Sequence, residues 1–236
     1  MKKVFLGYPT HLMVNTTCIL SLFTAMDYAR AKGYDIRFSP VIGESLITRA
    51  RNTLVRKFLE TDCDIFMCFD ADIEILQYDT IVNLIEDLNT VDFTGALYPI
   101  KTEELRCSSI LFTDKHEKLN YLNRALWLST GCWAMNRCVI DKLIDAYPEH
   151  WYTSDHPEAG HKTYDLFGLM VVQRDEGVRK LLSEDWSMCQ KYLEIGGEIW
   201  CNTKIILAHH GDYAYILPYV KEAPKAETPT VGFDLQ

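Results

Sequence analysis

The sequence predicts one α/β domain whose central sheet is twisted, mostly parallel and flanked by helices. Short apolar runs alternate with amphipathic segments through the first half of the chain, an order typical of parallel strands joined by right-handed crossovers. With 236 residues, 48% of them hydrophobic, the chain can bury the core of one large domain. We assign that domain to residues 1–212 and a tail with prolines and charged residues to 213–236.

Four apolar runs predict the strands of the first half. They lie at residues 4–7, 34–38, 63–69 and 93–98. The chain is expected to leave the first strand through a loop at Tyr8, Pro9 and Thr10, at the edge of the sheet where parallel strands end.

Three helices are expected between these strands, at residues 15–32, 45–60 and 79–88. Asn15 or Thr16 can cap the first helix, and Gly33 can end it. Apolar side chains at helical spacing mark the inner faces. In chain order they are Ile19, Phe23, Met26, Leu46, Ala50, Leu54, Phe58, Ile81, Leu84, Ile85 and Leu88.

The second half is less regular. Its expected elements, in chain order, are a strand at 126–135 broken at Gly131, a helix at 139–146, a helix at 181–193, a turn at Gly196 and Gly197, and a strand at 205–208. Residues 148–167 are rich in His, Tyr and Asp and follow no period. Gly131 marks either a close approach of backbone to a ligand or a β-bulge.

Composition excludes several classes of function. A formal charge of -9, from 24 basic and 33 acidic residues, argues against a nucleic-acid groove. The 8 cysteines are scattered singly, which favours reduced thiols and a cytoplasmic location. No apolar stretch approaches the roughly 20 residues of a membrane span. The apolar part of the N-terminus is too short for a secretory signal.

The most informative motif is Asp70-Ala71-Asp72, directly after the apolar run 63–69. Ligands of open α/β sheets gather beyond the carboxyl ends of strands. Two carboxylates there suit Mg²⁺ or Mn²⁺, which completes its shell with substrate phosphates. The alternative is an acidic turn that only caps the next helix.

Three further groups accompany this pair. Arg49, Asn52 and Arg56 share a helical face that can reach a nucleotide, or that is simply solvated. Ser183-Glu184-Asp185-Trp186 offers either plain capping or a general base beside an aromatic stacking face. His209-His210 follows the last strand, where an imidazole is either structural or a ligand suited to Mn²⁺.

Taken in order, these pieces resemble the GT-A glycosyltransferases, which use nucleotide-diphospho-sugars. The match runs from Val4 to about Tyr213. The opening and the helix at 48–52 look particularly like a small branch, encoded by large DNA viruses and phages, that glycosylates capsid proteins. The residues that carry the match are Gly7-Tyr8-Pro9-Thr10, Thr48-Arg49-Ala50-Arg51-Asn52, Phe69-Asp70-Ala71-Asp72, Thr130-Gly131-Cys132, Glu184-Asp185 and His209.

The resemblance implies a role for each matching residue. Asp72 and His209 would bind Mn²⁺ or Mg²⁺, and Asp70 would hold the ribose or the metal through water; whether His209 or His210 is the ligand stays open. Asp185 would be the catalytic base, since inverting members use the aspartate of this pair. The expected donor-site residues are Pro9, Thr10, Arg49, Asn52, Asp70, Ala71, Asp72 and Gly131. Glu184 and Trp186 would meet the acceptor.

The expected reaction transfers a sugar with inversion from a nucleoside diphosphate, UDP being the expected carrier, to a hydroxyl of a glycan or glycoprotein. One alternative is a haloacid-type phosphatase with Asp70 as nucleophile, although Glu74 stands where that family has Thr or Val. Another is an inactive glycan-binding module on the same scaffold. The sugar and the acceptor depend on residues 148–167, where His156, His161 and Asp165 either contact acceptor or only satisfy a loop.

Overall fold

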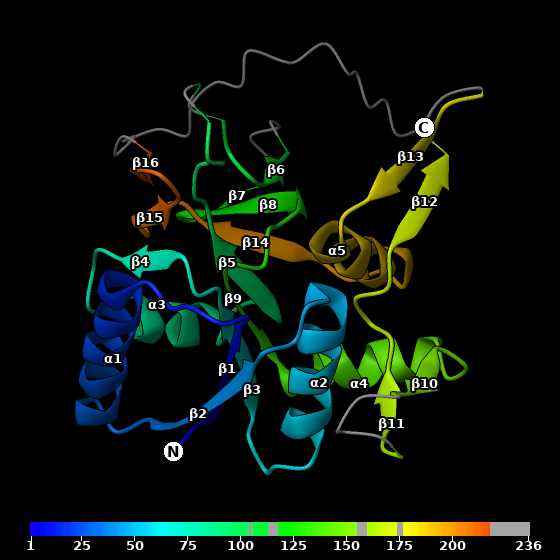
Figure 1. Ribbon diagram of the computed structural model, residues 1–236, viewed down its shortest axis with the longest axis horizontal. Helices are drawn as coiled ribbons and strands as arrows, with labels where there is room; N and C mark the ends of the chain where they lie inside the picture. Colours follow the sequence, from blue (N-terminus) through cyan, green and yellow to red (C-terminus); the bar gives the residue numbers. More distant parts are fainter. Residues whose placement is uncertain (103, 105, 113–117, 155–159, 174–176, 218–236) are drawn as a thin grey trace.

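The computed structural model describes residues 1–102, 104, 106–112, 118–154, 160–173 and 177–217. Its centre is a nine-stranded mixed sheet with helices on both faces (Figure 1). The strand order is β2-β1-β3-β9-β5-β14-β8-β6, with β7 paired to β8. A smaller sheet, β16-β15-β4, lies beside it, and β10-β11 and β12-β13 form two separate hairpins.

The first half follows the predicted alternation of strands and helices. Its elements are β1 Lys3–Thr10, α1 Thr16–Ala31, β2 Asp35–Ile42, α2 Ile47–Leu59, β3 Ile65–Phe69, β4 Ile73–Ile75, α3 Thr80–Asp87 and β5 Phe93–Ala96. Asn15 caps α1 as expected, since its Oδ1 accepts hydrogen bonds from the backbone N–H groups of Thr17 and Cys18 at 2.9 and 3.3 Å.

The second half contains shorter elements. They are β6 Ile110–Leu111, β7 Lys118–Leu119, β8 Leu122–Trp127, β9 Cys132–Asn136, α4 Arg137–Ala146, β10 Trp151–Thr153, β11 Lys162–Tyr164, β12 Met170–Gln173, β13 Arg179–Leu182, α5 Glu184–Glu194, β14 Ile199–Asn202, β15 Leu207–His210 and β16 Ala214–Ile216. β16 lies at the start of the segment expected as a tail, and its pairing with β15 extends ordered structure to Ile216.

Most long strands of the sheet run in one direction. β1 pairs in parallel with β2 and β3, and β5 pairs in parallel with β14. β9 runs against both β3 and β5, so its first residue, Cys132, pairs with Phe69 at the end of β3. We call the edge where β1, β2 and β3 end the carboxyl edge, and the edge where they begin the amino edge. The reversal of β9 brings Gly131 to the carboxyl edge.

Two hydrophobic clusters hold the helices to the sheet. Leu54 of α2, Val139 of α4 and Met188 of α5 pack in one cluster, which also contains Phe66 of β3. Leu22 of α1 and Leu84 of α3 pack in the other. The sheet is therefore covered by α2, α4 and α5 on one side and by α1 and α3 on the other (Figure 1).

The inner helix faces are partly as predicted. Met26, Ala50, Leu54, Phe58, Ile81, Leu84, Ile85 and Leu88 are all buried. The prediction that Phe23 and Leu46 face the core is wrong, since these side chains are 42% and 54% exposed. Leu46 precedes α2 as its N-cap residue, and α1 buries Cys18, Leu22 and Ala29, which were not predicted. Ile19 is partly buried and packs against the same cluster, as predicted.

Other corrections concern boundaries. Tyr8, Pro9 and Thr10 belong to β1, not to a loop, because they continue its parallel pairing with β2. The helix expected at 181–193 begins only at Glu184, since Leu181 and Leu182 pair with β12. Residues 199–202, for which no element was predicted, form β14. Residues 148–167 include the β10-β11 hairpin.

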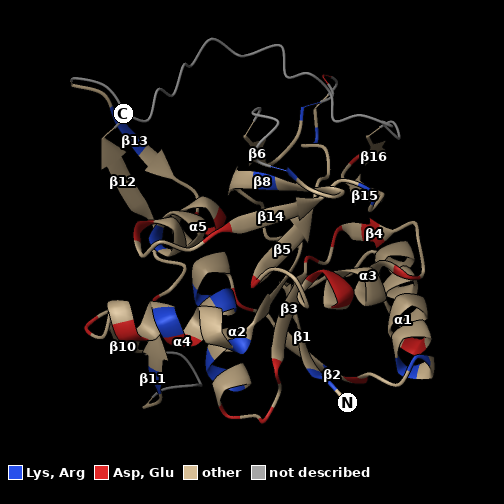
Figure 2. Ribbon diagram, turned by 180° about the vertical axis from the view of Figure 1, so that it is seen from behind, with Lys and Arg blue, Asp and Glu red and all other residues tan. Residues whose placement is uncertain are grey.

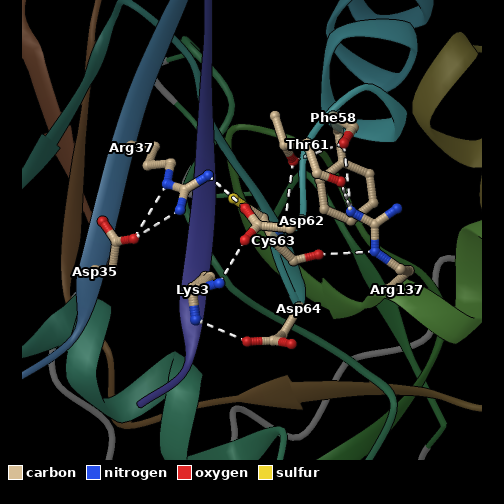
Figure 3. A network of polar contacts seen from close by, with 9 residues as sticks. All are labelled: Lys3, Asp35, Arg37, Phe58, Thr61, Asp62, Cys63, Asp64 and Arg137. Atoms are coloured by element: carbon tan, nitrogen blue, oxygen red, sulfur yellow. Dashed lines mark hydrogen bonds and ion pairs between the residues drawn. The ribbon is translucent and has the colours of Figure 1, made fainter.

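A network of charged side chains lies at the amino edge (Figure 3). Arg37 binds Asp35 at 3.0 Å and Asp62 at 2.6 Å, and Lys3 also contacts Asp62. Asp64 accepts a hydrogen bond from the backbone N–H of Lys3 at 2.8 Å. Arg137 also belongs to this network. It donates to the carbonyls of Cys63, Thr61 and Phe58 at 2.7, 2.9 and 3.3 Å.

Candidate active site

The acidic pair lies in a tight turn between β3 and β4, at the carboxyl edge. The backbone N–H of Asp70 donates to the carbonyl of Gly131 at 3.1 Å, and the N–H of Ile73 donates back to the carbonyl of Asp70 at 3.2 Å. The two carboxylates reach different partners from this turn. Asp70 contacts a buried arginine, and Asp72 contacts a lysine and a histidine.

Arg51 is the buried partner of Asp70, a role that was not predicted from the sequence. Its side chain is 3% exposed; Nη2 lies 3.0 Å from Asp70, and Nε lies 3.5 Å from Glu184. Arg51 therefore links the acidic turn to the start of α5. Burial opposes the charge on Arg51, but Asp70 outweighs it and keeps the pKa of the guanidinium above its usual value. Burial raises the pKa of Asp70 and of Glu184, while Arg51 works against both shifts.

Helical spacing explains where Arg51 points. It lies four residues before Val55 and seven before Phe58, both fully buried, so it shares the inner face of α2. The sequence signal that could have identified Arg51 is a cation on the apolar face of a helix, in a chain with carboxylates at a strand end.

Asp72 lies beside Lys101 and His209. Lys101 Nζ is 2.5 Å from Asp72 Oδ2, and His209 Nε2 is 3.4 Å from the same oxygen. Burial works against the charged carboxylate, but His209 and Lys101 lower the pKa of Asp72 to about 2. The other ring nitrogen of His209, Nδ1, lies 2.8 Å from the carbonyl of Pro99. Tyr98 packs edge-on against the His209 ring, with centroids 5.1 Å apart.

The neighbouring His210 has different partners. Its Nε2 lies 2.6 Å from Glu74 Oε2, and its Nδ1 lies 3.3 Å from the side-chain amide of Asn15. Both ring nitrogens of His210 are thus engaged with β4 and α1, whereas Nε2 of His209 faces Asp72.

The start of α5 carries the Glu184-Asp185 pair to the same edge. Asp185 Oδ1 accepts hydrogen bonds from the Ser183 hydroxyl and from the backbone N–H of Trp186, the latter at 2.8 Å. Ser183 is the N-cap residue as expected, but its side chain binds Asp185 and makes no cap hydrogen bond to the backbone. Trp186 stacks on Trp127 with ring centroids 4.6 Å apart.

The prediction that Arg49, Asn52 and Arg56 form one shared polar face is wrong. Asn52 is 1% exposed, donates to Asp165 Oδ1 at 2.7 Å and accepts from the N–H of Phe167 at 3.0 Å. Arg49 binds Glu44 at 2.5 and 2.7 Å. Arg56, also buried, binds Glu60 at 2.7 Å, so the three side chains serve separate regions.

Asp165, from the irregular segment 148–167, lies near this region and is held by Asn52. Lys191 of α5 also donates to the carbonyls of Asp165 and Leu166, at 3.0 and 3.1 Å. His161 is exposed. His156, for which an acceptor contact was considered, lies outside the described residues.

Gly131 is required by a tyrosine. Its N–H donates to the Tyr98 hydroxyl at 2.9 Å, and a Cβ at this position would lie 2.6 Å from that oxygen. Close approach of a buried side chain therefore explains the glycine, where a ligand or a β-bulge was expected. Pro9 and Thr10 end β1 at the same edge, and both are buried.

Charge is unbalanced at the carboxyl edge. Figure 2 shows acidic residues on β4 and at α5. The carboxylates of the region are Asp70, Asp72, Glu74, Glu184 and Asp185, and the cations bound to them are Arg51 and Lys101. Within the described ranges, no three acidic, His or Cys side chains are grouped so as to hold a metal by themselves. Asp72 and His209 can supply two ligands, a set that fits an ion whose remaining ligands are phosphates and water.

A separate cavity of about 600 Å³ lies near the amino ends of β5 and β14. Asp92, Tyr192 and Trp200 are among its lining residues, and none of the predicted site residues is. No helix in the described part of the chain has the length and apolar character needed to span a membrane.

Comparisons with known proteins support the fold. No family model matches the chain, and no curated protein matches it. Among solved structures, A197 from STIV aligns with 97% of this chain and 100% of its own, with a TM-score of 0.57 and 13% identity. The predicted fold class, a single α/β domain with a mostly parallel central sheet flanked by helices, is confirmed by the strand order, and this likeness shows that A197 shares the fold.

Two further structures align less closely. One is a glycosyltransferase involved in the glycosylation of the major capsid of PBCV-1, with a TM-score of 0.35 and 11% identity over 65% of this chain and 68% of that one. The other is TarS 1-349 of S. aureus, with a TM-score of 0.45 and 11% identity over 92% of this chain and 60% of that one.

Proposed function

We propose that the protein is a metal-dependent, inverting glycosyltransferase. It moves a sugar from a nucleoside diphosphate, with UDP as the expected carrier, to a hydroxyl of a glycan or glycoprotein. The observation that carries the proposal is the pairing of Asp72 Oδ2 with His209 Nε2, 3.4 Å apart, on the sheet edge that also carries Asp185. Open α/β sheets bind ligands beyond the carboxyl ends of their strands, and this edge of the sheet supports the proposal for that reason.

Asp72 and His209 are the proposed ligands of Mn²⁺ or Mg²⁺. Oxygen and nitrogen ligands of such an ion lie about 2.1 Å from it, so two neighbouring ligands are roughly 3 Å apart, close to the observed separation. The Pro99 carbonyl only accepts, so His209 Nδ1 carries a proton, and Nε2 is the nitrogen that would bind the ion. His209 is preferred to His210 because Glu74 and Asn15 engage both nitrogens of His210. When bound, the ion neutralises charge on the leaving diphosphate.

Asp185 is the proposed base. Ser183 and the N–H of Trp186 both bind Oδ1 and fix the orientation of the carboxylate. The acceptor hydroxyl gives its proton to Oδ2 as its oxygen attacks the anomeric carbon. Arg51 holds Glu184, the preceding residue, and thereby positions the start of α5 relative to Asp70.

The other proposed roles follow the sequence analysis. Asp70 holds the ribose or the metal through water; Pro9, Thr10, Arg49 and Ala71 line the nucleotide, and Trp186 and Glu184 meet the acceptor. Asn52 and Gly131 act on the site indirectly, through Asp165 and Tyr98. The phosphatase alternative is disfavoured because both oxygens of Asp70 lie within 3.1 Å of Arg51 Nη2. This ion pair makes the carboxylate less available to attack as a nucleophile.

A thermal-shift panel of nucleoside diphosphate sugars, with and without Mn²⁺, tests donor binding. A matching donor at a hundredfold its dissociation constant adds about 2.7 kcal/mol to stability. Asp72→Asn should lose the Mn²⁺-dependent part of the shift. Asp92→Asn is a matched control, because Asp92 also pairs with a lysine and its side chain is 42% exposed, against 40% for Asp72. Equal shifts for all three proteins would overturn the metal site.

Replacement of the base tests the chemistry. Asp185→Asn is expected to reduce turnover by about two to four decades, the usual worth of general base assistance. Donor binding in the thermal-shift panel should stay unchanged. Turnover within a few fold of the parent would show that Asp185 is not the base. Complete absence of donor hydrolysis and transfer in the parent, with Mn²⁺ present, would favour the glycan-binding alternative.

A further inference from the structure

Lys101 shares its carboxylate oxygen with the proposed metal site. Its ammonium lies 2.5 Å from Asp72 Oδ2, the same oxygen that lies 3.4 Å from His209 Nε2. The side chains of Lys101 and Asp72 are 35% and 40% exposed, so the contact is not locked by burial. Lys101 lies in the chain that follows β5, outside all the motifs that the sequence analysis singled out.

The stem of Lys101 is guided by a glycine. A Cβ on Gly211, which follows β15, would lie 2.9 Å from Cδ of Lys101. Any larger residue at 211 would therefore push the lysine stem aside. The lysine stem thus passes close to Gly211, next to the strand that carries His209.

Electrostatics sets this ammonium against a divalent ion. Lys101 Nζ lies 2.5 Å from Asp72 Oδ2, closer to that oxygen than His209 Nε2 at 3.4 Å. An ion bound to the same oxygen would lie within a few ångströms of the ammonium, and two like charges at that distance repel each other. The two cations therefore compete for Asp72.

We propose that Lys101 is an exchangeable counter-ion of the cation site and a second cation for the donor's diphosphate. Its ammonium neutralises Asp72 until a divalent ion binds there, and it then moves to the diphosphate oxygens. A lysine suits this task because its charge is compact and its four-carbon stem is flexible. Ammonium groups are common ligands of phosphate oxygens in proteins. This inference rests on the proposed function and adds a residue to it.

Mn²⁺ and UDP titrations of variants test the inference. We would compare the parent with Lys101→Met and Lys101→Arg, measuring Mn²⁺ affinity by calorimetry without nucleotide and UDP affinity at saturating Mn²⁺. Removing the competing ammonium should tighten Mn²⁺ binding by about threefold to tenfold, the worth of a partly exposed ion pair together with repulsion of the incoming ion. The same variant should bind UDP several fold more weakly.

Two further variants make the outcome decisive. Lys101→Arg should bind UDP like the parent, because a cation is kept. Lys142→Met is a matched control: Lys142 pairs with Asp92 at 3.3 Å on another part of the surface and should change neither affinity. If Lys101→Met has the parent's affinity for Mn²⁺, or binds Mn²⁺ more weakly, the inference is wrong. Unchanged Mn²⁺ binding by Asp72→Asn would instead overturn the metal site of the proposed function.

Discussion

The amino and carboxyl edges of the sheet both carry charged clusters, but only one of them is balanced. At the amino edge three carboxylates face three cations, namely Asp35, Asp62, Asp64, Lys3, Arg37 and Arg137 (Figure 3). At the carboxyl edge, among the residues that the structure describes, the five carboxylates around the acidic turn have Arg51 and Lys101 as the lysine and arginine bound to them.

This difference in charge balance distinguishes a candidate binding site from a purely structural network. Charges at the amino edge bind one another or close backbone carbonyls, so they hold strand starts together. Those at the carboxyl edge leave a surplus of negative charge, which favours an added cation. The carboxyl edge also contains a buried cation, Arg51, which is 3% exposed, while Lys3 and Arg37 at the amino edge are 36% and 40% exposed.

The largest effect is expected from Arg51→Met. The substitution leaves Asp70 and Glu184 partly buried without their shared cation, which typically costs about 3–5 kcal/mol of unfolding free energy. Urea denaturation measures the loss. Arg106→Met is the matched control, because its ion pair with Glu104 is 69% and 72% exposed and should be worth close to nothing. Similar losses for both variants would contradict the contrast between buried and exposed pairs.

Arg137→Met should have a smaller effect, at the amino edge. Arg137 donates to three backbone carbonyls and its guanidinium lies 4.1 Å from the centre of the Phe58 ring. Leaving those carbonyls unpaired is expected to cost about 1–3 kcal/mol. Turnover of folded protein should not change, because the residue lies at the other edge from the acidic turn. If the folded variant lost most of its turnover, the amino edge would also serve the reaction, and the assignment of separate roles to the two edges would be wrong.

The smallest effect is expected from Asp62→Asn. Hydrogen bonds from Lys3 and Arg37 lower the pKa of Asp62 from 3.8 to about 2. A lowered pKa means that the folded state prefers the carboxylate, so the contribution of Asp62 is present above about pH 4 and fades as the pH falls towards 2. Urea midpoints of parent and variant should differ at pH 7 and converge near pH 2. High salt should also reduce the difference, and a gap that widens in acid would contradict the assignment.

Local patterns were sufficient to predict the acidic turn. Residues 65–69 are wholly buried and Asp70 follows them directly, so hydrophobicity alone predicted both the strand and the position of the carboxylates. The cap at Asn15 and the apolar face of α3 were predictable for the same reason, because each depends on neighbours in the sequence.

Elements fixed by distant partners were not predictable. β14 has only four residues, and its place depends on pairing with β5 and β8. Leu181 and Leu182 continue the helical pattern of α5, yet they pair with Val171 and Met170 in a hairpin. The role of Arg51 was missed because its two partners, Asp70 and Glu184, come from separate strands and helices.

The position of β14 has a consequence for protein synthesis. It lies between β5 and β8, two strands that leave the ribosome well before it does. Until Ile199–Asn202 emerge, both of those strands expose unpaired backbone edges, which are sites for wrong pairing and aggregation. Closure of the sheet is therefore a late step, and nascent chains that stop before residue 199 are expected to be the ones that depend on chaperones.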